Sequence, residues 1–424
     1  MISDSAKRVI PKADKYIWAI YILLLIVSVI ELYSASSREV VASNVAAPLM
    51  RHCTMLLLGI VLTVGISRLH YKWLIPLTPI FVTFTVLLGL YVLFKGDIIN
   101  GARRSTTILG IAIQPAELLK LSCVLFIALV MSRLQERNGV RPSGVVISAT
   151  FGLICGGLLF TQGMTNTLLL MAISFAMMLI AGVQWSKFLI VLGVYAVIAA
   201  GGWYVKSERA EDQSQEEVEL SVEKGGQTID RTGTQIGRLL AWWGDGTPKY
   251  EQKITSKNRQ EMYSYMAQAN GGLHGRIPGN SRETARLPLA FSDYIYAMVG
   301  EDWGLLGGIG LLLVYLWLVS RAGGIASRCT RAFPALLVMG MAVMVTAQAL
   351  FHMAIVTGVF PVSGQPLPLI SKGGSSIIAT SIAFGIILSV SRYATGSSDS
   401  TKAVNAEMLQ LPTEMTAQNP TQLQ

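Results

Sequence analysis

Long apolar segments separated by polar connections dominate the pattern along the chain. Ten of them approach or exceed the roughly 20 apolar residues that cross a bilayer: 17–33, 52–67, 74–94, 117–132, 144–160, 165–183, 187–205, 294–320, 333–358 and 375–391. Apolar runs of this length predict transmembrane helices rather than strands or soluble core helices. The pattern predicts an all-α polytopic membrane protein with about ten transmembrane helices.

The spans divide the chain into five parts. Residues 1–16 form an N-terminal tail, 17–205 hold spans one to seven, and 293–392 hold spans eight to ten. Between them, residues 206–292 form a long loop, and 393–424 form a tail that is rich in Ser, Thr, Gln and Asn and is expected to be disordered. The first span follows several basic residues and is interpreted as an uncleaved helix because its apolar core is long.

Composition supports the membrane class and excludes others. Apolar residues make up 52% of the chain and charged residues only 14%, whereas soluble domains carry about 25% charge. The net charge of +9 is scattered between apolar segments, which argues against nucleic-acid binding. The four cysteines lack CxxC spacing and the four histidines lack ligand spacing, so neither a disulfide framework nor a histidine metal site is predicted.

The basic residues of the tails and short loops predict the orientation. With the N-terminus inside, fifteen lie on the cytoplasmic side and seven on the outer side, and an excess of Lys and Arg marks the cytoplasm. Both termini are therefore expected in the cytoplasm, and loop 206–292 is expected on the extracytoplasmic side of the membrane. A multi-pass location in the cytoplasmic (inner) membrane follows.

The long loop has two parts of different character. Segment 207–227 is polar and acidic and is expected to be mobile, although the whole loop carries twelve basic and twelve acidic residues. Segments 236–243 and 258–269 interleave aromatic and polar residues, as amphipathic helices on the outer leaflet do. An ordinary packed surface loop is the alternative interpretation.

Asp293 is the first candidate for chemistry. It lies where the long loop meets the apolar eighth span, and an ionisable group at the mouth of a span is a functional hypothesis by default. The structural alternatives are an N-cap, a role that Ser292 could also fill, or a salt bridge to Arg282 or Arg286. Glu301 and Asp302 lie about two turns further on and would be buried; helix-end solvation or a structural ion pair is their expected role.

A second candidate stretch, residues 100–120, joins spans three and four on the outer side. Arg103 and Arg104 suit an anionic lipid diphosphate through charge-assisted contacts, or they anchor the chain at the interface. Glu117 and Lys120 share one helix face, so they either neutralise each other or present charge to a cavity.

A third stretch, residues 360–376, carries three prolines and three glycines between spans nine and ten. Irregular backbone at membrane depth is tolerated where it is buried in protein or lines a cavity. Lys372, Ser375 and Ser376 could approach a phosphate at the start of the last helix. Together with the turn at 161–167, the three stretches are expected to form one outward-facing cavity fed by a lipid groove.

At these residues the chain resembles the SEDS family (shape, elongation, division and sporulation) of peptidoglycan glycosyltransferases. The resemblance rests on the ten spans and on three motifs in order, GARR…QPAELLK at 101–120, ARLPLAFSDYIYAMVGED at 285–302 and GQPLPLISKGGSS at 364–376. It covers almost the whole chain. The lead-in GRIPGNSRE at 275–283 and the third motif are more similar to FtsW-type, septal members than to RodA-type members.

The resemblance implies an enzyme that polymerises lipid II, with Asp293 at the position of the family's essential aspartate. That carboxylate would deprotonate the 4-hydroxyl of an acceptor N-acetylglucosamine, whose oxygen displaces the lipid diphosphate from the donor N-acetylmuramic acid with inversion, giving a β-1,4 link. Candidate groups for binding substrate or diphosphate are Arg103, Arg104, Glu117, Lys120, Arg286, Lys372, Ser375 and Ser376.

Further ligands and partners are implied by the same resemblance. A divalent cation, magnesium or manganese, would serve the diphosphate, although the sequence offers no dedicated carboxylate cage for it. A class B penicillin-binding protein would supply transpeptidation, among other division proteins at the septum. It would engage the outer loop and spans eight and nine, where Gly307, Gly308 and Gly310 allow close helix approach; intramolecular packing explains these glycines equally well.

The chain departs from the family pattern at several positions. Leu289 and Phe291 stand where relatives often carry Glu and His, the segment 162–167 lacks the acid of the QPDLGT motif, and Ser363 replaces a common Lys. These changes leave the single base in place and put the phosphate contacts in doubt. Two rival functions remain, a lipid II flippase, which would need midplane polar groups and inverted repeats, and a non-catalytic division scaffold.

Overall fold

The computed structural model describes residues 12–36, 46–99, 102–108, 111–136, 139–160, 162–198, 200–201, 242, 253–255, 258–283, 286–287 and 290–393. Eight helices within them are long and apolar enough to cross a membrane. They are α1 (Lys15–Ser36), α2 (Ala46–Arg68), α3 (Leu74–Lys95, preceded by the short 3-10 helix η2, Tyr71–Trp73), α4 (Pro115–Arg133), α5 (Pro142–Phe160), α11 (Ile295–Ala326), α12 (Ala332–Val356) and α13 (Gly374–Tyr393). The polytopic helical fold is confirmed.

Two shorter apolar helices correspond to the predicted sixth and seventh spans. They are α6 (Met164–Ile180) and an unlabelled helix at Trp185–Ile198. The predicted break between spans five and six is confirmed, because α5 ends at Phe160 and α6 begins at Met164. A total of ten spans stays a prediction, since these two helices fall short of the length that marks the other eight.

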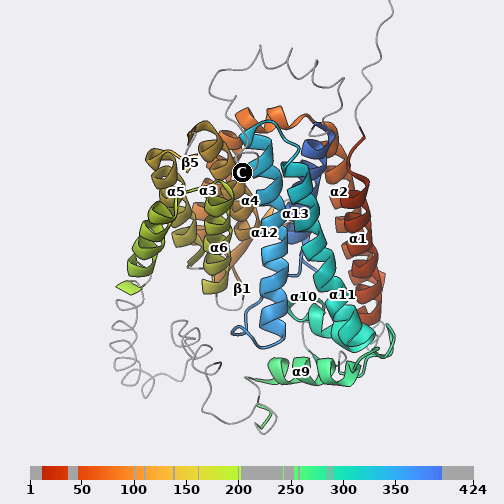
Figure 1. The fold of residues 1–424 in the computed structure, drawn as a ribbon. Helices are drawn as coiled ribbons and strands as arrows, with labels where there is room; N and C mark the ends of the chain where they lie inside the picture. The colour runs from red at the N-terminus through yellow and green to blue at the C-terminus, as the bar shows by residue number, and fades with distance from the viewer. Residues whose placement is uncertain are drawn as a thin grey trace, which may run out of the picture.

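Three helices form the centre of the bundle. Most side chains of α4, α12 and α13 are buried, whereas α2 and α11 keep one face exposed along most of their length. Figure 1 shows α12 in the middle, with α4 behind it and α13 beside it. The buried residues of this centre are mainly Leu, Ile, Val, Met and Ala, so the polar residues described below stand out within it.

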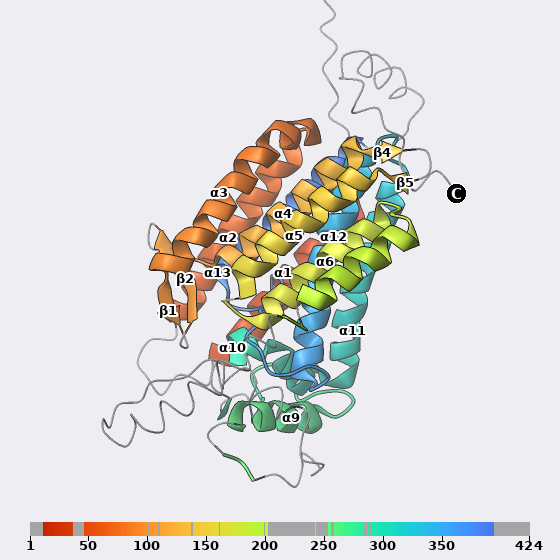
Figure 2. The same ribbon diagram turned by 90° about the vertical axis from the view of Figure 1, so that its left-hand side faces the viewer.

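Short strands that the sequence analysis did not predict connect some helices. Strands β1 (Asp97–Ile99), β2 (Ala102–Ile108) and β3 (Ile111–Ile113) form an antiparallel sheet between α3 and α4. Figure 2 shows β1 and β2 at the end of α3. Strands β4 (Gln135–Glu136) and β5 (Gly139–Val140) form a second antiparallel pair between α4 and α5.

The long loop contributes helix α9 (Arg259–Gly271), which confirms a helix at the predicted segment 258–269. Figure 1 shows α9 lying across the ends of α11 and α12. Its buried side joins a second, smaller apolar cluster, whose buried members are Ala267, Leu287, Tyr294, Ala297, Met298 and Val356. Its place on the outer leaflet stays a prediction. The other predicted helix, 236–243, lies outside the described residues except for Trp242, whose indole N–H donates to the Gly358 carbonyl at 2.9 Å.

Helix α11 is interrupted near its start at Gly304, where φ is 69° and ψ is −167°. The loop after α9 fills this break with its backbone. Arg276 N–H donates to the Glu301 carbonyl at 3.0 Å, and Leu305 N–H donates to the Gly272 carbonyl at 2.9 Å. A Cβ on Gly304 would lie 2.4 Å from the nitrogen of Gly275, so only glycine allows this approach.

The first and last described segments lie at the same end of the bundle. The Asp14 N–H donates to the Ser391 hydroxyl at 3.1 Å, at the end opposite α9 and α10 (Ala290–Asp293) (Figure 1). This agrees with both termini being on one side of a membrane. The cytoplasmic assignment of that side stays a prediction, and the predicted tails and segment 207–227 fall largely or wholly outside the described residues.

Candidate active site

Asp293 ends a helix of one turn and lies directly before the start of α11. It is partly buried, and the intervening Tyr294 (φ −128°, ψ 22°) separates α10 from α11. The predicted place at the mouth of the eighth span is therefore confirmed. Tyr294, rather than Asp293 or Ser292, occupies the N-cap position of α11, so neither of the two residues is its N-cap.

The Pro- and Gly-rich loop at 364–373 packs against this turn. A Cβ on Gly364 would lie only 3.0 Å from Asp293 Oδ2, so the loop backbone closely approaches the carboxylate. Two residues before Asp293, the Phe291 carbonyl accepts the Lys372 N–H at 2.9 Å. The Lys372 ammonium lies 4.3 Å from the centre of the Phe291 ring. Two of the three predicted stretches thus meet at Asp293.

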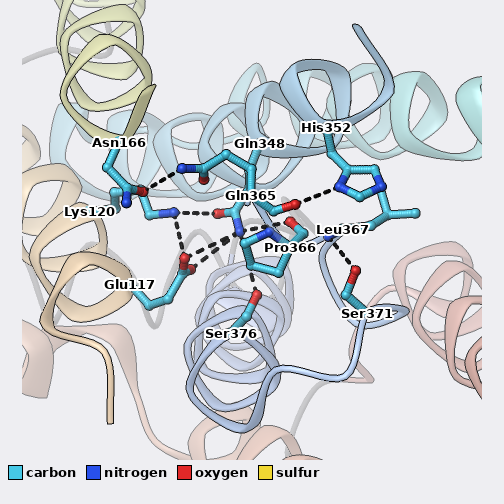
Figure 3. A network of polar contacts seen from close by, with 10 residues as sticks. All are labelled: Glu117, Lys120, Asn166, Gln348, His352, Gln365, Pro366, Leu367, Ser371 and Ser376. Atoms are coloured by element: carbon cyan, nitrogen blue, oxygen red, sulfur yellow. Dashed lines mark hydrogen bonds and ion pairs between the residues drawn. The ribbon is translucent and has the colours of Figure 1, made fainter. Parts of the chain in front are cut away.

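The second candidate stretch, residues 100–120, reaches the same loop through a buried ion pair. Lys120 Nζ donates to Glu117 Oε1 at 2.8 Å and to Gln348 Oε1 at 2.8 Å, and these side chains are 0%, 3% and 3% exposed. Gln348 Nε2 donates onward to the Pro366 carbonyl at 3.3 Å and contacts Ser376 Oγ at 3.4 Å. Figure 3 shows this network between α4, α12 and the loop. Glu117 and Lys120 therefore neutralise each other, which is the first of the two alternatives predicted for them, rather than presenting charge to a cavity.

A second arm of the network begins one turn along α12 at His352. Its Nδ1 lies 2.6 Å from the Gln365 carbonyl, and because a carbonyl only accepts, Nδ1 carries the hydrogen. Gln365 Nε2 donates to Asn166 Oδ1 at 2.8 Å, as Figure 3 also shows. The turn at 162–167 is therefore connected to the loop beside Asp293, and the outward-facing cavity expected there stays a prediction.

The remaining predicted site residues have different surroundings. Ser375 and Ser376 are buried in the first turn of α13. Arg286 is exposed and its guanidinium lies 3.5 Å from Glu283. Arg103 and Arg104 lie on β2, with Arg103 opposite Ile98, and their side chains fall outside the described residues. Contact of any of these groups with a diphosphate stays a prediction, and in this conformation Lys120 faces the interior.

Glu301 and Asp302 are buried, as predicted, but solvation is not their role. Glu301 Oε1 accepts the backbone N–H groups of Arg282 at 2.7 Å and Glu283 at 2.9 Å. Asp302 accepts hydrogen bonds from the Ser34 hydroxyl, at 2.6 Å, and from the Ser281 hydroxyl. Both carboxylates thus fasten the segment that leads into the Asp293 turn to α11 and α1.

Sequence reasoning missed Gln348, His352, Gln365 and Ser371 as members of the site. A usable signal was present for the first two, because polar residues spaced i, i+4 inside an apolar span share one face and need partners there. Within the described ranges, no group of three or more His, Cys, Asp or Glu side chains could hold a metal ion. The predicted divalent cation stays a prediction.

Fold and site together define a polytopic helical membrane protein whose polar groups converge beside one partly buried carboxylate at one end of the bundle. The chain belongs to the FtsW, RodA and SpoVE family of cell cycle proteins, whose sequence model matches residues 14–396. It is similar to proteins named "Probable peptidoglycan glycosyltransferase FtsW" from Trichlorobacter lovleyi (29% identity, covering 86% of this chain and 89% of the relative) and Polynucleobacter necessarius (26% identity, 92% and 88%).

Solved structures show the same fold. A chain from a study of the structural coordination of polymerization and crosslinking by a peptidoglycan synthase complex superposes with a TM-score of 0.69, at 23% identity over 91% of this chain and 99% of that one. The rod shape determining protein RodA of Thermus thermophilus superposes with a TM-score of 0.61, at 22% identity over 91% and 98%. At this identity the likeness concerns the fold alone.

Proposed function

We propose that this protein is a membrane-embedded glycosyltransferase that polymerises lipid II into the glycan strands of peptidoglycan. Membership of the family and the names of the curated relatives support the reaction class. The observation that carries the assignment to a site is the fixed position of Asp293, a partly buried carboxylate held against the loop at 364–373.

Asp293 acts as the general base. It accepts the proton of the 4-hydroxyl of the acceptor N-acetylglucosamine as that oxygen forms a bond to C1 of the donor N-acetylmuramic acid. The bond between C1 and the diphosphate oxygen breaks, and the diphosphate leaves with the bonding electron pair. Attack opposite the leaving group inverts C1 and gives a β-1,4 link. A diphosphate leaves without protonation, so a single carboxylate suffices.

Positive groups around Asp293 would stabilise the leaving diphosphate. Lys372 is a described candidate beside the Asp293 turn, because its backbone N–H donates to the Phe291 carbonyl at 2.9 Å. Arg286 is exposed and lies seven residues before Asp293 in the chain, and Arg103 and Arg104 on β2 would add further positive charge. A bound magnesium or manganese ion would neutralise part of the diphosphate charge.

A class B penicillin-binding protein is the proposed partner for crosslinking, with action at the division septum. The structural neighbour from a peptidoglycan synthase complex supports an assembly of this kind. Of the three glycines expected at its interface, Gly307 and Gly308 pack against Trp303 and Tyr296 of the same helix, whereas nothing lies within 4 Å of a Cβ on Gly310. Gly310 and the exposed apolar side chains around it are the better contact surface.

The test is polymerisation of labelled lipid II by the purified protein with its partner and magnesium. Asp293→Asn keeps the shape of the side chain and removes the base, so polymer yield should fall at least about 100-fold. Glu261→Gln is the matched control, since Glu261 lies on α9, where it accepts the Tyr265 hydroxyl at 2.7 Å.

Polymer from wild type and control alone supports the enzyme, and equal polymer from Asp293→Asn removes Asp293 from its role. Lipid translocation without polymer, unaffected by Asp293→Asn, would instead support a flippase. If the wild type gives neither polymer nor translocation, the remaining hypothesis is a non-catalytic division scaffold.

A further inference from the structure

The short helix that ends at Asp293 depends on outside partners. With four residues, α10 is too short to be stable alone, and its last carbonyls have no partners inside the helix. Two of them are satisfied by the loop after α12. The Ser371 hydroxyl donates to the Ser292 carbonyl at 2.7 Å, and the Lys372 N–H donates to the Phe291 carbonyl at 2.9 Å.

Ser371 is the side chain that joins the loop to this helix. It is 1% exposed, and its oxygen also accepts the Leu367 N–H at 2.8 Å (Figure 3). The carbonyl that it binds belongs to the peptide unit between Ser292 and Asp293. Because a peptide unit is planar, fixing this carbonyl also fixes the direction in which the backbone of Asp293 leaves it.

The turn that carries Ser371 is itself tightly determined. Leu369 lies within it at φ 64° and is fully buried, a backbone conformation that a branched side chain keeps only when its surroundings impose it. The Ser371 and Gly373 N–H groups donate to the Leu367 and Ser371 carbonyls at 3.0 and 2.8 Å. The hydroxyl is thus presented from a rigid support.

We propose that Ser371 is a positioning residue, whose hydroxyl holds the peptide unit before Asp293 so that the carboxylate faces the acceptor hydroxyl. Gly364 lies against the carboxylate itself, since a Cβ there would be 3.0 Å from Asp293 Oδ2. This inference rests on the proposed function of Asp293 as the base. Ser371 acts through the backbone rather than on the reacting atoms, so its loss should affect the rate more than substrate binding.

The test compares Ser371→Ala with Ser389→Ala in lipid II polymerisation by the full chain and its partner. Ser389 is an equally buried serine near the other end of α13, where its hydroxyl donates to the Leu69 carbonyl at 2.6 Å. Ser371→Ala should lower kcat by about tenfold or more with KM changed by less than about threefold. Ser389→Ala should leave both constants near wild type, and Ser371→Thr, which keeps the hydroxyl, should restore most of kcat.

Equal kcat values for Ser371→Ala and Ser389→Ala overturn the inference, as does a change confined to KM. If Ser371→Ala does not yield folded protein, Ser371→Cys decides on the same measure, because a thiol is close to a hydroxyl in size and is a weak donor. Wild-type protein that makes no polymer refutes the proposed function and this inference with it. Polymer from wild type and unchanged Ser371→Ala refutes this inference alone.

Discussion

Polar contacts fasten distant segments at both ends of the bundle, but the two sets differ in burial. At the Asp293 end, Glu117 and Lys120 are almost fully enclosed and bond to Gln348. At the opposite end, the Arg321 guanidinium lies 2.5 Å from the Asp14 carboxylate, and the Arg321 side chain is 26% exposed whereas that of Asp14 is 8% exposed. The first set holds the loop beside the candidate base, and the second holds the start of α1 to α11.

The difference decides what each contact can do. A buried charge that loses its partner stays unpaired in a medium that solvates it poorly, whereas an exposed one is taken up by water. The interior network therefore tolerates little change, and it fixes the loop backbone through the carbonyls of Gln365 and Pro366. The Asp14–Arg321 pair, whose guanidinium is partly exposed to solvent, adds modestly to stability. Four substitutions test this contrast.

Removing the cation of the interior pair should have the largest effect. Lys120→Met leaves Glu117 buried without its counter-charge and should cost about 3–5 kcal/mol of unfolding free energy. Thermal unfolding of the detergent-solubilised protein measures this loss. Adding Glu117→Gln to Lys120→Met removes the orphaned charge and should recover much of the stability. Wild-type stability in the single variant would contradict the contrast.

Breaking the second arm should have a smaller effect. His352→Leu leaves the buried Gln365 carbonyl without its donor, which should cost about 1–3 kcal/mol. His352→Asn is the matched variant, because its amide N–H takes roughly the place of Nδ1. The melting temperatures of wild type and His352→Asn should be close, and that of His352→Leu should be lower. Equal melting temperatures of the two variants would show that the hydrogen bond contributes nothing to stability.

A change at Gly364 should affect activity rather than stability. The added Cβ would lie 3.0 Å from Asp293 Oδ2 and should displace the carboxylate, so Gly364→Ala is expected to lower the polymerisation rate about tenfold, equivalent to about 1.4 kcal/mol. Gly157→Ala on α5, where nothing lies within 4 Å of the added Cβ, is the control in the same assay. An equal loss of activity in both variants would contradict displacement of the Asp293 carboxylate as the cause.

The partly exposed Asp14–Arg321 pair should give the smallest effect, with a definite pH dependence. Burial raises the pKa of Asp14, but hydrogen bonds from Arg321 and from backbone N–H groups lower that pKa by more, so it lies below its ordinary 3.8. The stabilisation by ionised Asp14 is therefore present above pH 3.8 and is lost as pH falls through the lowered pKa.

Asp14→Asn should accordingly cost about 0.5–1 kcal/mol at neutral pH, and the difference from wild type should shrink below the ordinary pKa of the carboxyl. Unfolding measured across this pH range checks the sign. A difference that grows toward acid pH would contradict it.

The sequence predicts the spans well because each is a continuous apolar run. Whether such a run forms a transmembrane helix depends more on its own composition than on the segments that pack against it. The sequence also brings the Asp293 turn and the loop at 364–373 to one end through topology, since both adjoin spans that open on the same side. The i, i+3 spacing of Glu117 and Lys120 predicts their contact, but not whether the pair faces a cavity. That choice depends on α12, which supplies Gln348 from far along the chain.

Other features could not be read from local pattern in the same way. The break in α11 at Gly304 exists because the chain near Gly275 fills it, and a lone glycine in an apolar helix does not reveal such a partner. The sheet between α3 and α4 carried a signal that went unused, because β1 and β2 are separated in sequence by Asn100 and Gly101, the dipeptide that favours two-residue hairpin turns.

The interruption at Gly304 gives the chain after α9 a place to bond inside a membrane-spanning helix. On one side of the break, the Arg276 and Ile277 N–H groups donate to the Glu301 and Asp302 carbonyls, and on the other the Leu305 and Leu306 N–H groups donate to the Gly272 and Leu273 carbonyls. The two halves of α11 are therefore joined to the same segment, so the segment that leads from α9 toward Asp293 is held by the bundle through backbone bonds that do not depend on the identity of side chains.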